Sequence, residues 1–187
     1  MKKIIIGGVI GFVLIIGMWL TSSYNTMVKA NLAVDTQWAQ VETQYQRRFD
    51  LIPSLVGAVK GIMKQETTVF TAIAEARQGY AGARTVNEKA VAAGQMESAL
   101  ARLLVITENY PQLRSIEAVT NLQTQLEGTE NRVSVERTRF NDIVGSFNVQ
   151  VSTFPGNLMA KIFGFEKRPF FKSAESAEKA PVVDLIQ

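Results

Sequence analysis

Apolar residues recur at alternating spacings of three and four along most of this chain, and this spacing constrains the fold more than any other feature. It gives each helix one apolar stripe, which must be buried against other helices. Alternation of period two, the pattern of a half-buried strand, is absent over any useful length. We therefore expect an all-α protein. The stripe positions are Met27, Val34, Trp38, Val41 and Tyr45; Ile52, Val56, Val59, Met63, Phe70 and Ile73; Met96, Ala99, Leu103, Ile106 and Tyr110; and Val119, Leu122, Leu126, Val133, Phe140, Ile143 and Phe147.

The N-terminus carries an uncharged, mostly apolar run from Ile4 to Leu20, preceded by two lysines. At 1.5 Å per residue the run spans about 26 Å, on the short side for a bilayer core. The alternative is a cleaved signal peptide, but the run is longer than such a peptide needs and no clear A-x-A site follows it. We expect residues 1–23 to be a single-pass transmembrane anchor, whose lysines place the N-terminus in the cytoplasm and the bulk of the chain outside it. The residues chosen to represent the anchor are Ile4, Gly7, Gly11, Leu14 and Trp19, and the Gly7–Gly11 spacing suits pairing of two anchors.

Three breaks divide the remaining chain: GYAGAR at 79–84, NYP at 109–111 and FPG at 154–156. After the first break, Thr85 and Glu88 have the spacing of a capping box. With a further corner near residue 50, the helical segments are about 24–48, 51–78, 85–108 and 111–150. Similar lengths joined by short loops predict an antiparallel four-helix bundle with long helices, although the fourth segment must bend at Gly128 or end near Gly145 to match its partners.

The stretch RRFDLIP, residues 47–53, supplies the signals for that corner. Arg47 and Arg48 suit the negative end of one helix, Asp50 can cap the next, and Pro53 falls in its first turn. The alternative is one long helix kinked at Pro53.

Several long motifs resemble the LemA family: YNTMV at 24–28, QWAQVETQYQRRFDLIPSLVGAVKG at 37–61, EAR at 75–77, LLVITENYPQLRS at 103–115, NLQTQLEGTENRVSVERTRFNDIVGSFN at 121–148, and FPGNLMAKIFGFEKRPFF at 154–171. The resemblance covers residues 24–171. It implies a helical bundle behind one N-terminal membrane helix, and it implies no reaction or catalytic residue. The aromatic Tyr45 stands where family members more often carry an aliphatic side chain.

Composition limits the chemistry. The chain contains no cysteine and no histidine, which excludes thiolate sites, disulfides and the commonest general base and metal ligand. Its 20 basic and 17 acidic residues give no sign of a nucleic-acid partner. We expect the charges of TENRVSVERTRF, including Glu130 and Arg137, to form a solvated helix face. Glu66 and Glu136 interrupt apolar stripes, so each needs a partner, for which Arg77 or Arg132 is available.

The C-terminal part divides into two further segments. Beyond the bundle domain, 24–155, we expect an amphipathic aromatic and basic segment at 156–172 and a mobile tail at 173–187. In an up-down-up-down bundle the amphipathic segment returns towards the bilayer, where it either contacts the membrane surface or caps the open end of the core. The residues expected at the membrane surface are Phe163, Phe165, Lys167, Arg168, Phe170 and Phe171.

These features favour a protein that is not an enzyme and needs no cofactor, metal or small-molecule substrate. We expect a single-pass, membrane-anchored interaction or scaffold protein in a bacterial cell membrane. Its partners would be the lipid bilayer and other proteins, or further copies of itself bound through helical surfaces. The alternative is an extracytoplasmic sensor or accessory subunit that signals through a membrane partner.

Overall fold

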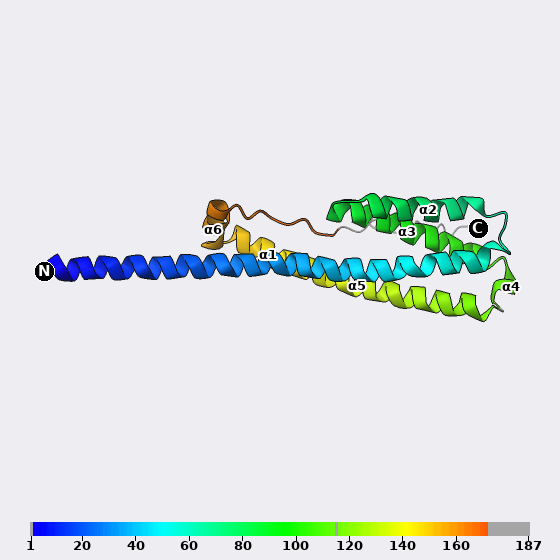
Figure 1. The fold of residues 1–187 in the computed structure, drawn as a ribbon, viewed down its shortest axis with the longest axis horizontal. Coiled ribbons are helices and arrows are strands. Elements are labelled where there is room, and N and C mark those ends of the chain that lie inside the picture. The colour runs from blue at the N-terminus through cyan, green and yellow to red at the C-terminus, as the bar shows by residue number, and fades with distance from the viewer. Residues whose placement is uncertain (1, 115, 172–187) are drawn as a thin grey trace, which may run out of the picture. The chain divides into compact units, whose positions relative to one another are not determined.

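The structure is a computed structural model that describes residues 2–114 and 116–171, and every regular element in that part of the chain is a helix (Figure 1). This confirms the all-α prediction. The mobile tail predicted at 173–187 lies outside the described residues. The helices are α1 (Lys2–Lys60), α2 (Thr67–Gly82), α3 (Val86–Thr107), α4 (Pro111–Arg114), α5 (Glu117–Ser152) and α6 (Gly156–Phe163).

The chain divides into two compact units. Unit 1 contains the chain up to Gln40 together with Thr138–Phe170, so it holds the first part of α1, the last part of α5, and α6. Unit 2 contains Val41–Arg137 and Phe171, and therefore holds the rest of α1 and α5 with α2, α3 and α4. Each unit has its own buried residues.

Helix α1 runs without interruption through the corner expected at Phe49–Asp50, so that prediction is wrong (Figure 1). The reason is the register of its apolar stripe. Tyr45, Arg48 and Ile52 follow one another at spacings of three and four, and all three are buried. The stripe therefore passes through the expected corner, with Arg48 in a position that an apolar residue would normally fill. Pro53 lies inside α1, and its side chain is exposed.

The first break after the N-terminus comes instead at residues 61–66, between α1 and α2, where the sequence had suggested a continuous helix 51–78. Helices α2 and α3 then pack side by side as a hairpin (Figure 1). The predicted capping box starts α3: Thr85 Oγ1 accepts a hydrogen bond from the Glu88 N–H at 3.2 Å, and Glu88 Oε2 accepts one from the Thr85 N–H at 3.1 Å.

The expected fourth segment is two helices, because α4 ends at Arg114 and α5 begins at Glu117. Helix α5 then passes through Gly128 and Gly145. Five expected stripe residues of α5 are buried, namely Val119, Leu126, Val133, Phe140 and Phe147, but the intervening stripe positions lie one residue later than expected. Val144 is fully buried, whereas Ile143 is only partly buried. In the observed register, Glu130 and Arg137 occupy stripe positions between Leu126, Val133 and Phe140.

An aromatic cluster joins three segments of unit 2. The ring of Tyr80 on α2 lies 4.5 Å from that of Phe49 and 5.5 Å from that of Tyr45, both on α1. Lys89 of α3 lies over the Tyr80 ring at 5.8 Å and pairs with Glu42 of α1. These contacts hold α1, α2 and α3 together at the end of the hairpin where its two helices are joined.

In unit 1, α1 packs against α5 through Trp38, whose ring lies 5.3 Å from that of Phe140 in an edge-on arrangement. Trp38 is only partly buried, so it borders the core and does not fill it as expected. The core positions are Met27 and Val34 of α1, Phe140, Val144 and Phe147 of α5, and Met159 of α6.

The continuity of α1 makes a testable prediction at Asp50, whose exposed side chain accepts a hydrogen bond from Gln46 Nε2 at 2.8 Å. Asp50→Pro should lower the free energy of unfolding by about 3 kcal/mol, because proline removes a helical N–H in mid-helix. Urea denaturation of the detergent-solubilised protein, followed by circular dichroism, measures this.

Asp50→Ala is the matched control and should change the stability by no more than about 0.5 kcal/mol, as at other exposed helix positions. If Asp50 instead capped a new helix, the alanine variant would lose about 1 kcal/mol and proline would be better tolerated. That pattern would restore the corner.

Candidate functional site

The anchor residues expected from the sequence lie on one exposed stretch of α1. Every large apolar side chain from Ile5 to Trp19 is between 39% and 72% exposed, including Leu14 at 58% and Trp19 at 44%. The side chain of Ile4 lies outside the described part of the structure. A Cβ added at Gly7 or Gly11 would meet nothing within 4 Å, so the pairing of two anchors through these glycines stays a prediction.

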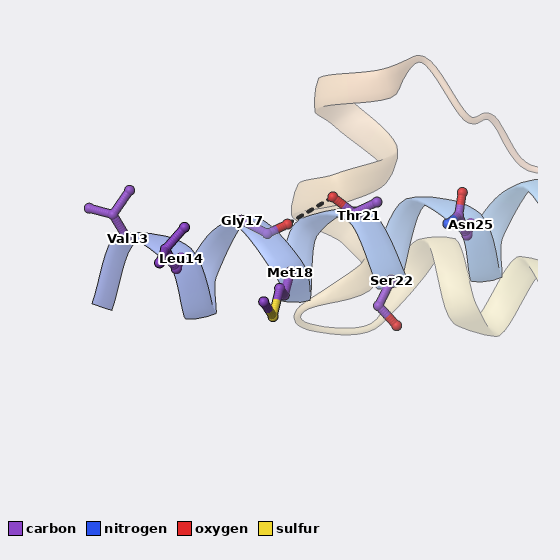
Figure 2. Close-up of a pocket in the computed structure, with 7 residues that line it drawn as sticks. All are labelled: Val13, Leu14, Gly17, Met18, Thr21, Ser22 and Asn25. Carbon is purple, nitrogen blue, oxygen red and sulfur yellow. Dashed lines mark hydrogen bonds between the residues drawn. The ribbon is translucent and has the colours of Figure 1, made fainter. Parts of the chain in front are cut away.

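Figure 2 shows the end of this stretch, where the character of α1 changes. Val13, Leu14 and Met18 project from the helix, and one turn later Thr21, Ser22 and Asn25 take their place around a shallow hollow. Thr21 Oγ1 donates a hydrogen bond to the Gly17 carbonyl at 2.8 Å, which satisfies the hydroxyl within the helix itself. The apolar surface of α1 therefore ends near Leu20.

Among the residues that the structure describes, two helices are long and apolar enough to cross a membrane, judged by length and composition. They are α1 and α3. None of the apolar window of α1 is buried, whereas 44% of that of α3 is buried. Helix α3 also carries the charged residues Glu97 and Arg102, which a membrane span would avoid. Together with its larger buried share, this gives α3 the character of a core helix.

The expected membrane-surface segment is held against α1 by its aromatic rings. The ring of Phe163 lies 4.8 Å from that of Tyr24, and the ring of Phe165 lies 6.0 Å from it. Arg168 pairs with Asp35. Its backbone N–H and C=O both bond to the side-chain amide of Asn148, at 2.8 and 2.9 Å.

The residues of this segment differ in how exposed their side chains are. Lys167 is exposed, and Phe163 and Phe170 are each 45% exposed. Phe171 is only 5% exposed and lies 4.4 Å beneath the guanidinium of Arg137 in unit 2. Phe171 is therefore buried by packing within the chain, and its contact with the membrane surface has no support from its exposure. Membrane contact by the others stays a prediction.

Four charged side chains meet in unit 2, and we call them the ion cluster: Arg48 of α1, Glu97 of α3, and Glu130 and Arg137 of α5. Arg48 bonds to Glu130 and lies 3.7 Å from Glu97, which in turn lies 3.3 Å from Arg137. The Arg48 side chain is 8% exposed. Burying a guanidinium is costly unless it is paired, and two carboxylates from two other helices provide that pairing.

The ion cluster is suited to holding α1, α3 and α5 in one register. Burial raises the pKa of the neighbouring Tyr45 phenol well above its usual value of 10.0, so this hydroxyl stays protonated near neutral pH. The Tyr45 hydroxyl and Arg48 Nε are buried and have no hydrogen-bond partner among the described residues. A polar group at a core position specifies which helices pair and in which register.

Sequence reasoning missed the ion cluster because it placed the intervening stripe positions of α5 one residue too early and ended a helix at Arg48. Glu130 and Arg137 were assigned to a solvated face, and Arg48 to a helix end. The signal was present: spacings of four and three connect Leu126, Glu130, Val133 and Arg137, as they do Tyr45, Arg48 and Ile52. Glu66 was recognised as needing a partner, which is the Tyr110 hydroxyl, donating to Glu66 Oε1 at 3.2 Å, and neither Arg77 nor Arg132.

Within residues 2–114 and 116–171, no group of three or more histidine, cysteine or acidic side chains is placed to hold a metal ion.

The comparison with protein families decides the classification. The LemA family profile matches residues 37–185, which is most of the chain. The chain belongs to the LemA family. It is also similar to two magnetosome proteins of Paramagnetospirillum magneticum, MamQ 1 and MamQ 2, with 22% identity to each over 88% of this chain and 70% of theirs. A magnetosome protein MamQ of Magnetospirillum gryphiswaldense is 29% identical over 48% of this chain and 33% of its own length.

The ion cluster of this LemA family protein can be tested at two adjacent arginines. Arg48→Met should lower the free energy of unfolding by about 3–5 kcal/mol, because it leaves Glu97 and Glu130 without their shared cation. Arg47→Met removes the same charge from an exposed position and should cost no more than about 0.5 kcal/mol. Urea denaturation measures both. Equal losses would show that Arg48 is not held in the core.

A second prediction concerns the pH dependence of stability. Burial, and to a lesser extent the Glu130 carboxylate, raises the pKa of Glu97 above its usual value of 4.5, although Arg137 and Arg48 oppose the shift. Between 4.5 and the raised pKa the folded protein therefore binds more protons than the unfolded chain, and stability falls as the pH rises. Glu97→Gln should remove this fall when unfolding is measured at successive pH values.

Glu88→Gln provides a control of opposite sign. Hydrogen bonds from the backbone N–H groups of Arg84 and Thr85 lower the pKa of Glu88, so its contribution is present above 4.5 and is lost as the pH falls. If the two variants changed the pH profile in the same direction, the assigned surroundings of Glu97 would be wrong.

Proposed function

We propose that this LemA family protein is a single-pass, membrane-anchored scaffold that binds other proteins, or further copies of itself, through its helical surfaces. The observation that carries this is the exposed apolar stretch of α1 from Ile5 to Trp19, which continues as one helix into the packed part of the chain. Burial of such an exposed apolar surface in a bilayer is favourable, and large exposed apolar surfaces mark sites of membrane or protein contact. Lys2 and Lys3 favour a cytoplasmic N-terminus, with the bulk of the chain extracytoplasmic.

The relatives point to a role at a membrane-associated structure. The three MamQ proteins are named for the magnetosome. We propose in addition that α2, α3 and the unit 2 parts of α1 and α5 pack as an antiparallel four-helix bundle. The ion cluster and the aromatic cluster support this, because together they tie all four segments to one another.

A sensor or accessory subunit is the second candidate function. It is favoured by the continuity of α1, because Arg48 of the ion cluster lies on the same helix as the anchor. A displacement of such a helix at one end can be transmitted along it. The two candidates differ in whether a partner's activity depends on this chain or only its position does.

Anchoring is tested by placing charge in the exposed stretch. Val9→Arg with Val13→Arg should release the protein from membranes during flotation and alkaline extraction. Two arginines cost about 5–7 kcal/mol in the centre of a membrane helix, which is comparable to what the apolar run contributes. Protease added from the extracytoplasmic side should digest the wild-type chain in intact membranes.

The matched control is Val91→Arg with Val105→Arg, which adds the same charge at two valines of α3 that are 59% and 64% exposed. This variant should stay with the membrane. Equal release of the two variants, or extraction of the wild type by alkali, would contradict anchoring by α1. Crosslinking of the intact protein in its own membrane, with identification of the captured species, tests the scaffold role. Repeated failure to capture any protein would contradict that role.

A further inference from the structure

The corner between α5 and α6 carries a stripe of exposed apolar side chains that are not buried within unit 1. Phe154, in the turn before α6, is 83% exposed, and Leu158 and Ile162 are 51% and 60% exposed. Leu158 and Ile162 are four residues apart within α6, which places them on one side of that helix. Met159 and Ala160, on the opposite side of α6, are buried. Helix α6 is therefore apolar on both its packed side and one exposed side.

This corner is fixed beside a defined stretch of α1. Trp19, Ser22 and Thr26 of α1 line one hollow together with Phe154 and Pro155. Gly156 allows the close approach, because a Cβ there would lie 2.1 Å from the Gln150 carbonyl oxygen and 3.2 Å from Met27 Cε. Figure 1 shows α6 alongside α1 in this unit.

The position along α1 determines what the stripe meets. If the apolar stretch up to Leu20 occupies the hydrocarbon core, residues 21–27 extend about 10 Å beyond its end. Headgroup and interfacial regions occupy about 5–8 Å on each side of a bilayer core. The part of the corner where Phe154 lies beside Trp19 and Ser22 is then at the level of the headgroups. Trp19 has the amphipathic ring that is enriched at this depth.

The exposed polar residues of α6 also suit a helix that lies along the membrane surface. Asn157 and Lys161 are exposed and lie about 100° around the helix from Leu158 and Ile162. A helix lying in the interface places one side among acyl chains and the adjacent side among headgroups, where a lysine meets anionic lipid. Lys167, in the segment that follows α6, is also exposed.

We propose that the α5–α6 corner is a second membrane contact, in which Phe154, Leu158 and Ile162 insert into the leaflet beside the anchor. Lipid is the occupant because any arrangement that places the apolar stretch of α1 in a bilayer brings that bilayer to this corner. The inference rests on the proposed anchoring and adds to it a face that lies along the membrane surface.

The test uses the full-length chain, which contains no cysteine, so single cysteines can be labelled with an environment-sensitive fluorophore. Leu158→Cys and Ile162→Cys report on the stripe, Asn157→Cys is the matched control on the same helix, and Leu14→Cys reports on the anchor. The proteins are placed in phosphatidylcholine vesicles containing phosphatidylglycerol, with nitroxides on the acyl chains as one quencher and aqueous iodide as the other. Labels at 158, 162 and 14 should be quenched by the nitroxides, and the label at 157 by iodide.

The other outcomes separate the two claims. Quenching by nitroxide at Leu14 with none at Leu158 or Ile162 beyond that at Asn157 would overturn the second contact and leave the anchor standing. Labels at 158 and 162 shielded from both quenchers would show that protein covers the stripe, which also overturns it. Absence of nitroxide quenching at Leu14 would overturn the anchor and the second contact together.

Discussion

The register of α1 is the constraint on which the rest of this structure depends. A helix turns by about 100° per residue, so an unbroken helix from Lys2 to Lys60 fixes which side chains share a face along its whole length. Buried residues from Met27 to Val59 follow that single register. Arg48 falls on it, and a guanidinium on a core stripe requires anions from the helices packed against it. Glu97 of α3 and Glu130 of α5 meet that requirement, and Arg137 of α5 pairs in turn with Glu97. Arg48 thus connects α1 to α3 and α5, while the aromatic cluster connects α1 to α2.

Sequence reasoning succeeded where the determinants are local. The capping box of Thr85 and Glu88, the break before Pro111 and the break at Pro155 each depend on a few neighbouring residues, and the structure contains all three. Sequence reasoning failed where the local structure depends on a residue far away in the sequence. Asp50 and Pro53 have the local character of a helix start, and the adjacent arginines have that of a helix end. The carboxylate that makes a continuous helix tolerable belongs to Glu130, 82 residues away from Arg48. Nothing in the neighbourhood of residue 50 indicates that partner.

The candidate membrane residues also divide into those that local sequence predicts and those whose exposure depends on tertiary contacts. The exposed stretch of α1 was predictable from composition, because its side chains are apolar on all sides. The C-terminal segment was recognised as aromatic and basic, but which of its rings face outward depends on tertiary contacts. Phe171 packs under Arg137, while the rings of Phe163 and Phe165 pack against the ring of Tyr24. Phe154, which the sequence treated as part of a break, is the most exposed aromatic ring of the described corner.

The continuity of α1 is tested most directly by the distance between spin labels at Thr43 and Lys60, two exposed positions of α1 within unit 2. In the full-length protein, pulsed electron paramagnetic resonance should give about 26 Å between the two backbone sites, the length of a straight helix at 1.5 Å per residue. A separation on the order of 10 Å, the spacing of two helices packed against each other, would mean that the chain turns near Asp50. Arg48 would then lie at a helix end, and the register on which this account depends would be wrong.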